Sequence, residues 1–288
     1  MKKLHLMGYC CSLGGVEETT AQGPLVIAES VDFEQVVQGS AAVAWDAFLT
    51  PPPHKDNVAA IADICQRLGQ TVSALVKQGD KFVVVGGDHT CAMGTWSGAY
   101  DALHQAGDIG LIWIDAHMDS HVLETSYSGR VHGMCLAALL GHGDPAFTSL
   151  FGSDPKLKPE NVCLIGVRSY EPEEAELLKK LNVRVYFIDE VKNRGFAVVL
   201  REAIAKVSEQ TVGYGLSLDL DAIDPADAPG VDVPAENGLS GLEVYRGLVH
   251  AATDPKLIGT EVVEFNPVKD KNRLTEKLAI VFLKALSG

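Results

Sequence analysis

Three polar clusters in this chain each follow a short run of apolar residues. They are Gly86-Gly87-Asp88-His89, Asp115-Ala116-His117-Met118-Asp119 and Asp219-Leu220-Asp221-Ala222-Ile223-Asp224-Pro225. In a parallel sheet, functional groups gather where the strands end at their carboxyl edge. If the apolar runs are neighbouring strands, the carboxylates and imidazoles of the three clusters meet at one edge of the sheet.

The chemistry that these side chains could perform is metal binding. In an extended segment, side chains at positions i, i+2 and i+4 point the same way, so those of Asp115, His117 and Asp119 are expected to converge. Several carboxylates in one place repel one another unless cations neutralise them. Asp and His ligands without thiolate suit Mn²⁺, with Fe²⁺, Co²⁺, Ni²⁺ or Zn²⁺ as alternatives. The candidate ligands are His89, Asp115, His117, Asp119, Asp219 and Asp221.

The size of this ligand set predicts two metal ions. It exceeds what one such ion usually takes from the protein in a catalytic site, whereas two ions can share bridging carboxylates and a water. Each motif alone also has a structural explanation, because Gly-Gly-Asp-His often forms a turn with a helix cap and short motifs match by chance. Their joint occurrence, each after an apolar run, favours the metal site.

The three motifs together resemble the metal-binding signatures of the arginase, agmatinase and formimidoylglutamase family of ureohydrolases. The resemblance extends over nearly the whole chain, as far as Glu264-Phe265-Asn266-Pro267. It implies two Mn²⁺ ligand sets that share Asp115 and Asp219, one completed by His89 and Asp119 and the other by His117 and Asp221.

The resemblance also implies how a guanidino group is hydrolysed. With two ions bound, a water loses its proton near neutral pH, and the hydroxide attacks the guanidinium carbon. Asp119 would move a proton to the leaving amine, and Glu264 would pair with the guanidinium. His132, in the loop Ser128–Gly133, matches a family proton shuttle, a role that suits an imidazole. The alternative for His132 is an exposed histidine near a helix start.

The residues expected around the substrate head group follow the family less closely. Ser128 matches a serine that helps to hold an α-carboxylate. His121 and Arg130 stand where arginases have Asn, and Glu171 replaces an Asp near the α-amino group. Val233 replaces a Thr that supports the guanidinium-binding Glu. Arg130 is expected either to pair with a substrate carboxylate or to face solvent.

The predicted reaction is hydrolysis of a small guanidino substrate to urea and an amine, with L-arginine giving L-ornithine as the first expectation. An agmatinase or guanidino-acid hydrolase would use the same metals with another head group, and a formimidoylglutamase would release formamide. The presence of Asp119, His132 and Glu264 argues against a non-catalytic metal-binding protein. The resemblance further implies a homo-oligomer, either a trimer or a hexamer.

The elements that must position these residues form an alternating series. Strands are predicted at residues 4–7, 82–85, 109–114, 162–166, 184–187, 214–218 and 257–263. Helices are predicted at residues 58–77, 93–106, 132–140, 172–180, 195–208, 241–252 and 271–286. This order predicts a mainly parallel central sheet with helices on both faces, a three-layer α/β/α fold of the arginase-like kind. One domain is expected over residues 1–288.

The composition excludes several other classes of protein. The chain has 288 residues, 47% of them hydrophobic, which is enough for one large core. A formal net charge of −14 argues against a nucleic-acid partner. No segment approaches the roughly 18 apolar residues of a membrane span, and the first residues lack an Ala-x-Ala cleavage site. The cytoplasm is therefore predicted, with the six cysteines reduced and buried and with Trp45, Trp96 and Trp113 as packing groups.

Overall fold

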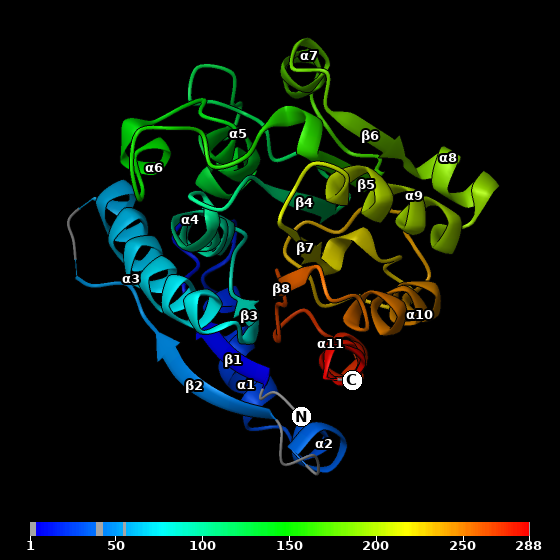
Figure 1. Ribbon diagram of the computed structural model, residues 1–288. Helices are drawn as coiled ribbons and strands as arrows, with labels where there is room; N and C mark the ends of the chain where they lie inside the picture. Colours follow the sequence, from blue (N-terminus) through cyan, green and yellow to red (C-terminus); the bar gives the residue numbers. More distant parts are fainter. Residues whose placement is uncertain (1–3, 39–42, 54–55, 288) are drawn as a thin grey trace.

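The computed structural model describes residues 4–38, 43–53 and 56–287, and in this part of the chain eight strands form one sheet (Figure 1). The strands lie in the order β2-β1-β3-β8-β7-β4-β5-β6, and all their pairings are parallel. Their bounds are β1 Leu4–Tyr9, β2 Val43–Leu49, β3 Lys81–Gly86, β4 Ile109–Ile114, β5 Val162–Val167, β6 Arg184–Phe187, β7 Gly213–Asp219 and β8 Leu257–Val263.

Helices cover both faces of the sheet, so the fold has three layers (Figure 1). Helices α3 to α6 lie over one face, and α9, α10 and α11 lie over the other. The predicted three-layer α/β/α fold with a parallel sheet is therefore confirmed. The helix bounds are α1 Gly23–Ala28, α2 Val31–Phe33, α3 Asn57–Gln78, α4 Cys91–Leu103, α5 Cys135–Leu139, α6 Pro145–Thr148, α7 Pro172–Lys180, α8 Ile188–Arg194, α9 Phe196–Ser208, α10 Gly241–Ala252 and α11 Leu274–Leu286.

The side chains of β4 show why the sheet needs cover on both faces. Ile112 and Ile114 belong to the core under α9, α10 and α11, whereas Leu111 and Trp113 belong to the core under α3 and α4. All residues of the strand are buried. Because alternate side chains point to opposite faces, a continuously apolar strand contributes to two cores at once. Each fully buried aliphatic side chain contributes about 1.5–3 kcal/mol to folding.

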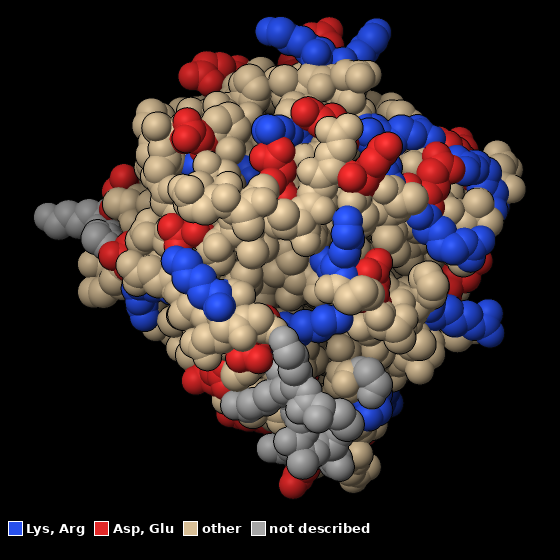
Figure 2. Space-filling model, in the orientation of Figure 1, with Lys and Arg blue, Asp and Glu red and all other residues tan. Residues whose placement is uncertain are grey.

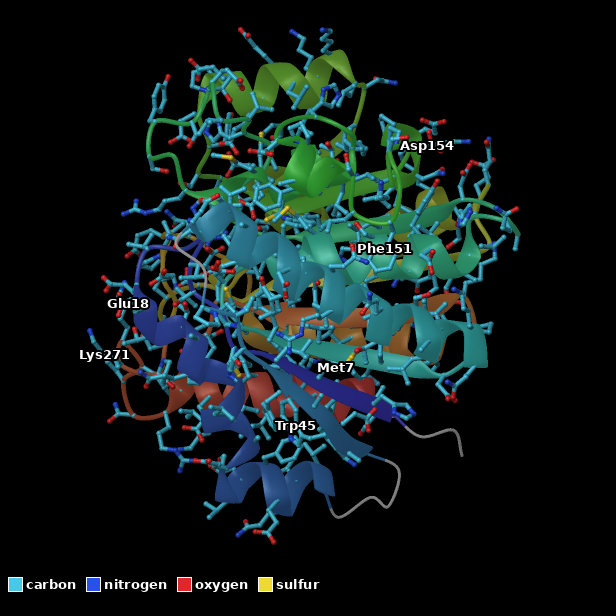
Figure 3. The ribbon with its side chains drawn as sticks, turned by 90° about the vertical axis from the view of Figure 1, so that its left-hand side faces the viewer. Met7, Glu18, Trp45, Phe151, Asp154 and Lys271 are labelled. Carbon is cyan, nitrogen blue, oxygen red and sulfur yellow. The ribbon has the colours of Figure 1, made fainter. Side chains whose placement is uncertain are left out.

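The edge strand β2 was missing from the predicted strands. Its sequence contains Asp46, and its side chains alternate between partly buried and exposed. Figure 3 labels Trp45 of this strand. Its indole lies 5.7 Å from the ring of Phe33 in α2 and stacks 4.8 Å from that of Phe48. An edge strand with one open face needs no continuous apolar run, so the pattern that identified the central strands does not mark this one.

A close crossing of α3 and α4 fixes α4, the helix that begins two residues after His89. A Cβ atom on Gly98 would lie only 2.2 Å from the carbonyl oxygen of Gly69, so the two backbones can touch only because both residues are glycine. The longer helix α3 begins after Asp56, whose carboxylate accepts a hydrogen bond from the Val58 N–H at 3.1 Å. It ends at Gly79, which has a left-handed backbone with φ 74°.

Acidic and basic side chains are interspersed over the face shown in Figure 2. Such a surface supports local ion pairs, for example between Lys158 and Asp108 at 2.7 Å. Each exposed pair of this kind contributes no more than about 1 kcal/mol to stability. Within the described residues, no helix is both long enough and apolar enough to cross a bilayer.

All six cysteines are free and buried, as the sequence predicted. Burial raises the pKa of Cys10 to about 11 and the pKa of Cys65 to about 12. Thiols with such pKa values are protonated at neutral pH and are poor nucleophiles and poor metal ligands. The cysteines are therefore part of the core rather than of the chemistry.

Candidate metal centre and active site

The candidate site lies at the carboxyl edge of the four strands β3, β8, β7 and β4, which are consecutive in the sheet. His89 follows β3, Glu264 follows β8 and Asp219 ends β7. Asp115 follows β4 directly. Residues that are far apart in the chain are brought together here because parallel strands all end at the same edge.

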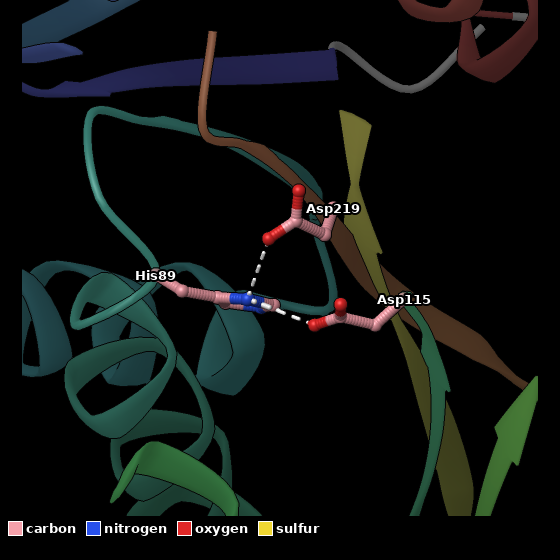
Figure 4. Close-up of side chains that lie close together, drawn as sticks. All are labelled: His89, Asp115 and Asp219. Carbon is pink, nitrogen blue, oxygen red and sulfur yellow. Dashed lines mark ion pairs between the residues drawn. The ribbon is translucent and has the colours of Figure 1, made fainter. Parts of the chain in front are cut away.

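His89 is the centre of a first cluster of ligand atoms. Its Nδ1 atom lies 3.1 Å from an oxygen of Asp119, 3.1 Å from one of Asp219 and 3.4 Å from one of Asp115. Figure 4 shows Asp115 and Asp219 aimed at the imidazole ring. This Nδ1 atom is buried and has no hydrogen-bond partner among the described residues. A buried nitrogen without a partner, surrounded by three carboxylates, fits the ligand set of a divalent cation.

A second cluster contains His117, Asp115 and Asp221. The Nδ1 atom of His117 lies 3.1 Å from Oδ2 of Asp221 and 3.4 Å from Oδ1 of Asp115. Asp115 thus turns Oδ1 towards this cluster and Oδ2 towards His89. That arrangement fits a carboxylate that bridges two cations. The second bridge, predicted at Asp219, stays a prediction, because its Oδ1 atom accepts a hydrogen bond from the Asp221 N–H at 2.8 Å.

The ligand segments are turns rather than extended strands. The segment 115–119 lies beyond the end of β4, and Asp119 has a left-handed backbone with φ 47°. Asp221 lies in a short 3-10 helix over Leu220–Ala222. The expectation that strand alternation aligns these side chains is therefore wrong, although the side chains do gather at one site. A left-handed backbone in a residue other than glycine is costly and is commonly found at functional sites.

The carboxylates of the two clusters have altered pKa values because they are buried together. Burial and the charges of Asp221 and Asp115 raise the pKa of Asp219 well above its ordinary value. Burial likewise raises the pKa of Asp221 to about 6. Burial also acts on Asp115, but the adjacent imidazoles of His117 and His89 hold the pKa of Asp115 below its ordinary range. Crowded carboxylates favour bound protons, because protons reduce their mutual repulsion. Bound cations would replace these protons.

Glu264 and His132 form a hydrogen-bonded pair beside the clusters. Oε1 of Glu264 lies 3.0 Å from Nδ1 of His132 and accepts a hydrogen bond from the His89 backbone N–H at 2.8 Å. Its other carboxylate oxygen is buried and has no hydrogen-bond partner in the part of the chain that the structure describes. Glu264 also has a left-handed backbone, with φ 67°. A buried acceptor oxygen left open in this way suits a cationic N–H donor.

This pair predicts that the stability of the metal-free protein depends on pH. Burial lowers the pKa of His132, but the carboxylate of Glu264 outweighs burial, and the pKa rises to about 9. The unfolded value is about 6.5. The stabilisation is therefore complete below about pH 6.5 and is lost as pH rises to about 9, by about 3 kcal/mol at most. We expect His132→Gln to remove this part of the pH dependence.

The measurement is the free energy of unfolding in urea, with a metal chelator present, between pH 6 and pH 9.5. The curve of the wild-type protein minus that of His132→Gln isolates this one group from the other titrating residues. The exposed His250 offers the matched control, since His250→Gln makes the same change far from the site. A difference curve that stays flat over this range would contradict the prediction.

A cavity of about 460 Å³ opens above the clusters. A cavity of this size can hold a small-molecule substrate. Glu264 is not itself a lining residue, but it contacts His132, which is one. The predicted site residues that line the cavity are His117, Asp119, His121, Ser128, Arg130, His132, Glu171, Asp219 and Asp221, together with Val233.

The outer end of this cavity contains a pair of glutamates held by His121. Nε2 of His121 lies 3.0 Å from Glu171 and 3.5 Å from Glu174, and Nδ1 lies 3.0 Å from the hydroxyl of Thr125. Glu174 was not among the predicted site residues, and burial raises its pKa to about 8. Its carboxylate accepts a hydrogen bond from the Glu171 N–H at 3.1 Å. In a capping box, a Glu lies three residues after the residue that precedes the helix. The spacing of Glu171 and Glu174 fits this signal and could have identified Glu174.

Ser128 and Arg130 lie on the exposed rim of the cavity. The Ser128 hydroxyl accepts a hydrogen bond from the Arg130 backbone N–H at 3.2 Å. Apart from that backbone contact, Arg130 forms no hydrogen bond or ion pair with the residues described here. Its guanidinium is therefore available to a ligand at the mouth of the cavity.

Comparison with known proteins decides the family. The sequence profile of the Arginase family matches residues 2–287. The chain belongs to the arginase family. It is 41% identical to an arginase from Bacillus caldovelox over 232 residues, which cover 81% of this chain and 77% of the relative. It is 35% identical to an arginase from Brevibacillus brevis, with 100% of this chain and 98% of the relative covered.

The fold agrees with this membership of the arginase family. The solved structure of the arginase from Bacillus caldovelox, native at pH 5.6, is similar to this protein with a TM-score of 0.92 at 34% identity. The match covers 100% of this chain and 99% of that chain. The predicted family and the predicted enzyme class, a hydrolase of guanidino C–N bonds, are thus confirmed. The clusters of His and Asp described above could hold the metal on which the family depends.

Proposed function

We propose that this protein uses two Mn²⁺ ions to hydrolyse L-arginine to urea and L-ornithine. The observation that supports this most directly is Asp115, whose two carboxylate oxygens face His89 and His117 in two separate clusters. A ligand set of carboxylates and imidazoles without thiolate favours Mn²⁺. The proposed ligands are His89, Asp115, Asp119 and Asp219 for one ion, and His117, Asp115, Asp219 and Asp221 for the other.

The residues of the chain would divide the chemistry among themselves. Two bound ions supply a hydroxide nucleophile near neutral pH. Asp119 lies in the cavity wall and is placed to move a proton to the leaving amine. Glu264 offers its open oxygen to the guanidinium and thereby orients the planar carbon. His132 contacts Glu264 and also lines the cavity, so it can exchange protons with solvent.

The outer end of the cavity supports an amino-acid head group. Glu171 supplies negative charge for an α-ammonium group, and His121 and Glu174 hold it in place. Arg130 and Ser128 supply a cation and a hydroxyl for an α-carboxylate. L-Arginine has both of these charges, whereas agmatine lacks the carboxylate and 4-guanidinobutyrate lacks the ammonium.

Arg130→Ala is expected to raise KM for L-arginine and for 4-guanidinobutyrate about three- to tenfold. The loss is modest because an exposed ion pair is worth about 1 kcal/mol. Both kcat values and the KM for agmatine should stay the same, since the guanidinium end of the site is intact. Steady-state urea assays with the three substrates measure this, and the remote, exposed Arg246→Ala is the control. An unchanged KM for L-arginine would show that Arg130 only faces solvent.

The choice of substrate is tested by comparing kcat/KM for L-arginine, agmatine and 4-guanidinobutyrate with the Mn²⁺-loaded protein. The proposal requires L-arginine to be the best of the three. A preference for agmatine would mean that Arg130 and Ser128 do not read a carboxylate, and formamide as the product would indicate a formimino substrate. We also propose that the protein is a single-domain, cytoplasmic homo-oligomer. Light scattering distinguishes the trimer and hexamer expected from the family.

A further inference from the structure

Glu261 is a buried carboxylate for which the proposed reaction has no use. It lies on β8 and is fully buried. In the register of the sheet it pairs with Ser217 of β7, so the two side chains are cross-strand neighbours. A carboxylate in the core is costly unless hydrogen bonds or charges compensate it. The groups around Glu261 therefore indicate what it does.

The indole of Trp96 in α4 holds this carboxylate in place. Its Nε1 atom donates a hydrogen bond to Oε1 of Glu261 at 2.7 Å. The indole fits here because β7 has a glycine beneath it, and a Cβ atom on Gly215 would lie 2.0 Å from the ring. An indole N–H can only donate, so it keeps Glu261 in the role of acceptor.

The carboxylate oxygen that accepts from Trp96 also faces the metal ligand His89. Oε1 of Glu261 lies 3.9 Å from Nε2 of His89, and this same Nε2 atom lies 2.7 Å from the hydroxyl oxygen of Ser217. The two ring nitrogens thus have different surroundings, with Ser217 and Glu261 at Nε2 and the proposed metal site at Nδ1.

We infer that Glu261 is a positioning residue that, acting through Ser217, keeps the proton of His89 on Nε2 and leaves Nδ1 free to bind metal. The negative carboxylate attracts the hydroxyl proton of Ser217. The oxygen of Ser217 then accepts a hydrogen bond from the Nε2–H group of His89. This inference rests on the proposed metal centre, and it concerns the cluster that contains His89 rather than the one that contains His117.

Glu261→Gln tests the inference, because it keeps the size of the side chain and an acceptor for Trp96 but removes the charge. The Ser217 hydroxyl is then free to donate to Nε2 of His89, and the ring proton moves to Nδ1, where it competes with metal. Outer partners of metal ligands typically change affinity about 10- to 100-fold. We expect the affinity for one of two Mn²⁺ ions to fall by about that factor, and the affinity for the other ion to stay the same.

The first measurement is a titration of metal-free protein with Mn²⁺, in which electron paramagnetic resonance monitors binding. The melting temperature of the metal-free form is measured alongside it. Trp96→Phe is the matched control, since it keeps the carboxylate and an aromatic ring but loses the N–H donor. It should change the affinities for the two Mn²⁺ ions by no more than about threefold, well short of the loss expected for Glu261→Gln. Two unchanged affinities in Glu261→Gln would overturn the role of Glu261. An equal loss at both sites with a lower melting temperature would also overturn it, because such a loss indicates a structural role.

A second measurement needs only the wild-type protein, so it tests the protonation of His89 that the inference requires even if the variant does not fold. Histidine labelled with ¹⁵N in protein loaded with diamagnetic Cd²⁺ should show His89 bound to metal through Nδ1 and protonated on Nε2. Metal coupling to Nε2 of His89 would overturn the inference. Wild-type protein that binds no Mn²⁺ at all would instead overturn the proposed metal centre.

Discussion

Asp115→Asn should lower urea release from L-arginine about a thousandfold or more, which corresponds to about 4 kcal/mol in the barrier. Asp115 is fully buried and offers one oxygen to each ligand cluster. An amide at this position has a single carbonyl oxygen, so it can serve only one of the two clusters. The protein should therefore lose at least one of its two Mn²⁺ ions together with its activity.

The metal content after gel filtration and the rate of urea release, measured on the same sample, test this prediction. Asp63→Asn makes the same chemical change at an exposed position of α3 and should leave both quantities unchanged. The bridging role of Asp115 would be wrong if the Asn variant kept two Mn²⁺ ions and full activity.

Glu264→Gln should lower kcat/KM for L-arginine about 150- to 5000-fold while both Mn²⁺ ions stay bound. Glu264 is buried, and its open carboxylate oxygen is the proposed partner of the guanidinium. Replacing a buried charge leaves the substrate cation without its counter-charge, which costs about 3–5 kcal/mol in buried pairs. The metal ligands are not altered, so metal binding should survive.

This second prediction is separated from a general loss of structure by two further variants. Glu264→Asp keeps the charge on a shorter side chain and should recover part of the activity. Glu243→Gln changes an exposed residue of α10 and should have no effect. A Gln variant with normal kcat/KM would refute the role of Glu264 in substrate binding, and one that lost both metals would show that Glu264 supports the metal centre instead.

Much of the fold could be predicted from the sequence because its central strands are buried on both faces. The run at residues 109–114 is continuously apolar, and the structure gives β4 the same bounds. The edge strand β2 differs, since only one of its sides is paired and half of its side chains are partly open. The short helix α8, at the far edge of the sheet, was missed for a related reason, because most of its side chains are exposed.

The metal ligands were predictable for a different reason, since they lie in compact motifs that directly follow the strands. Residues that act through tertiary contacts were not predictable, because such contacts depend on how the helices and strands pack together. Trp113, for example, was expected to be a packing group, but its N–H donates to Asp115 at 2.8 Å and its ring stacks 4.1 Å from that of His89. Trp96 and Glu261 are a second case, since they meet only when α4 lies over β8.

Urea release from L-arginine, measured before and after metal removal, tests the central claim most directly. The protein would be stripped with a chelator, assayed, reloaded with Mn²⁺ and assayed again, with bound metal and L-ornithine quantified in parallel. Two-metal hydrolysis predicts no turnover in the stripped protein, and equal amounts of urea and L-ornithine once two Mn²⁺ ions are bound. If the reloaded protein held two Mn²⁺ ions and released no urea, or if the stripped protein remained fully active, the proposed two-metal hydrolysis of L-arginine would be wrong.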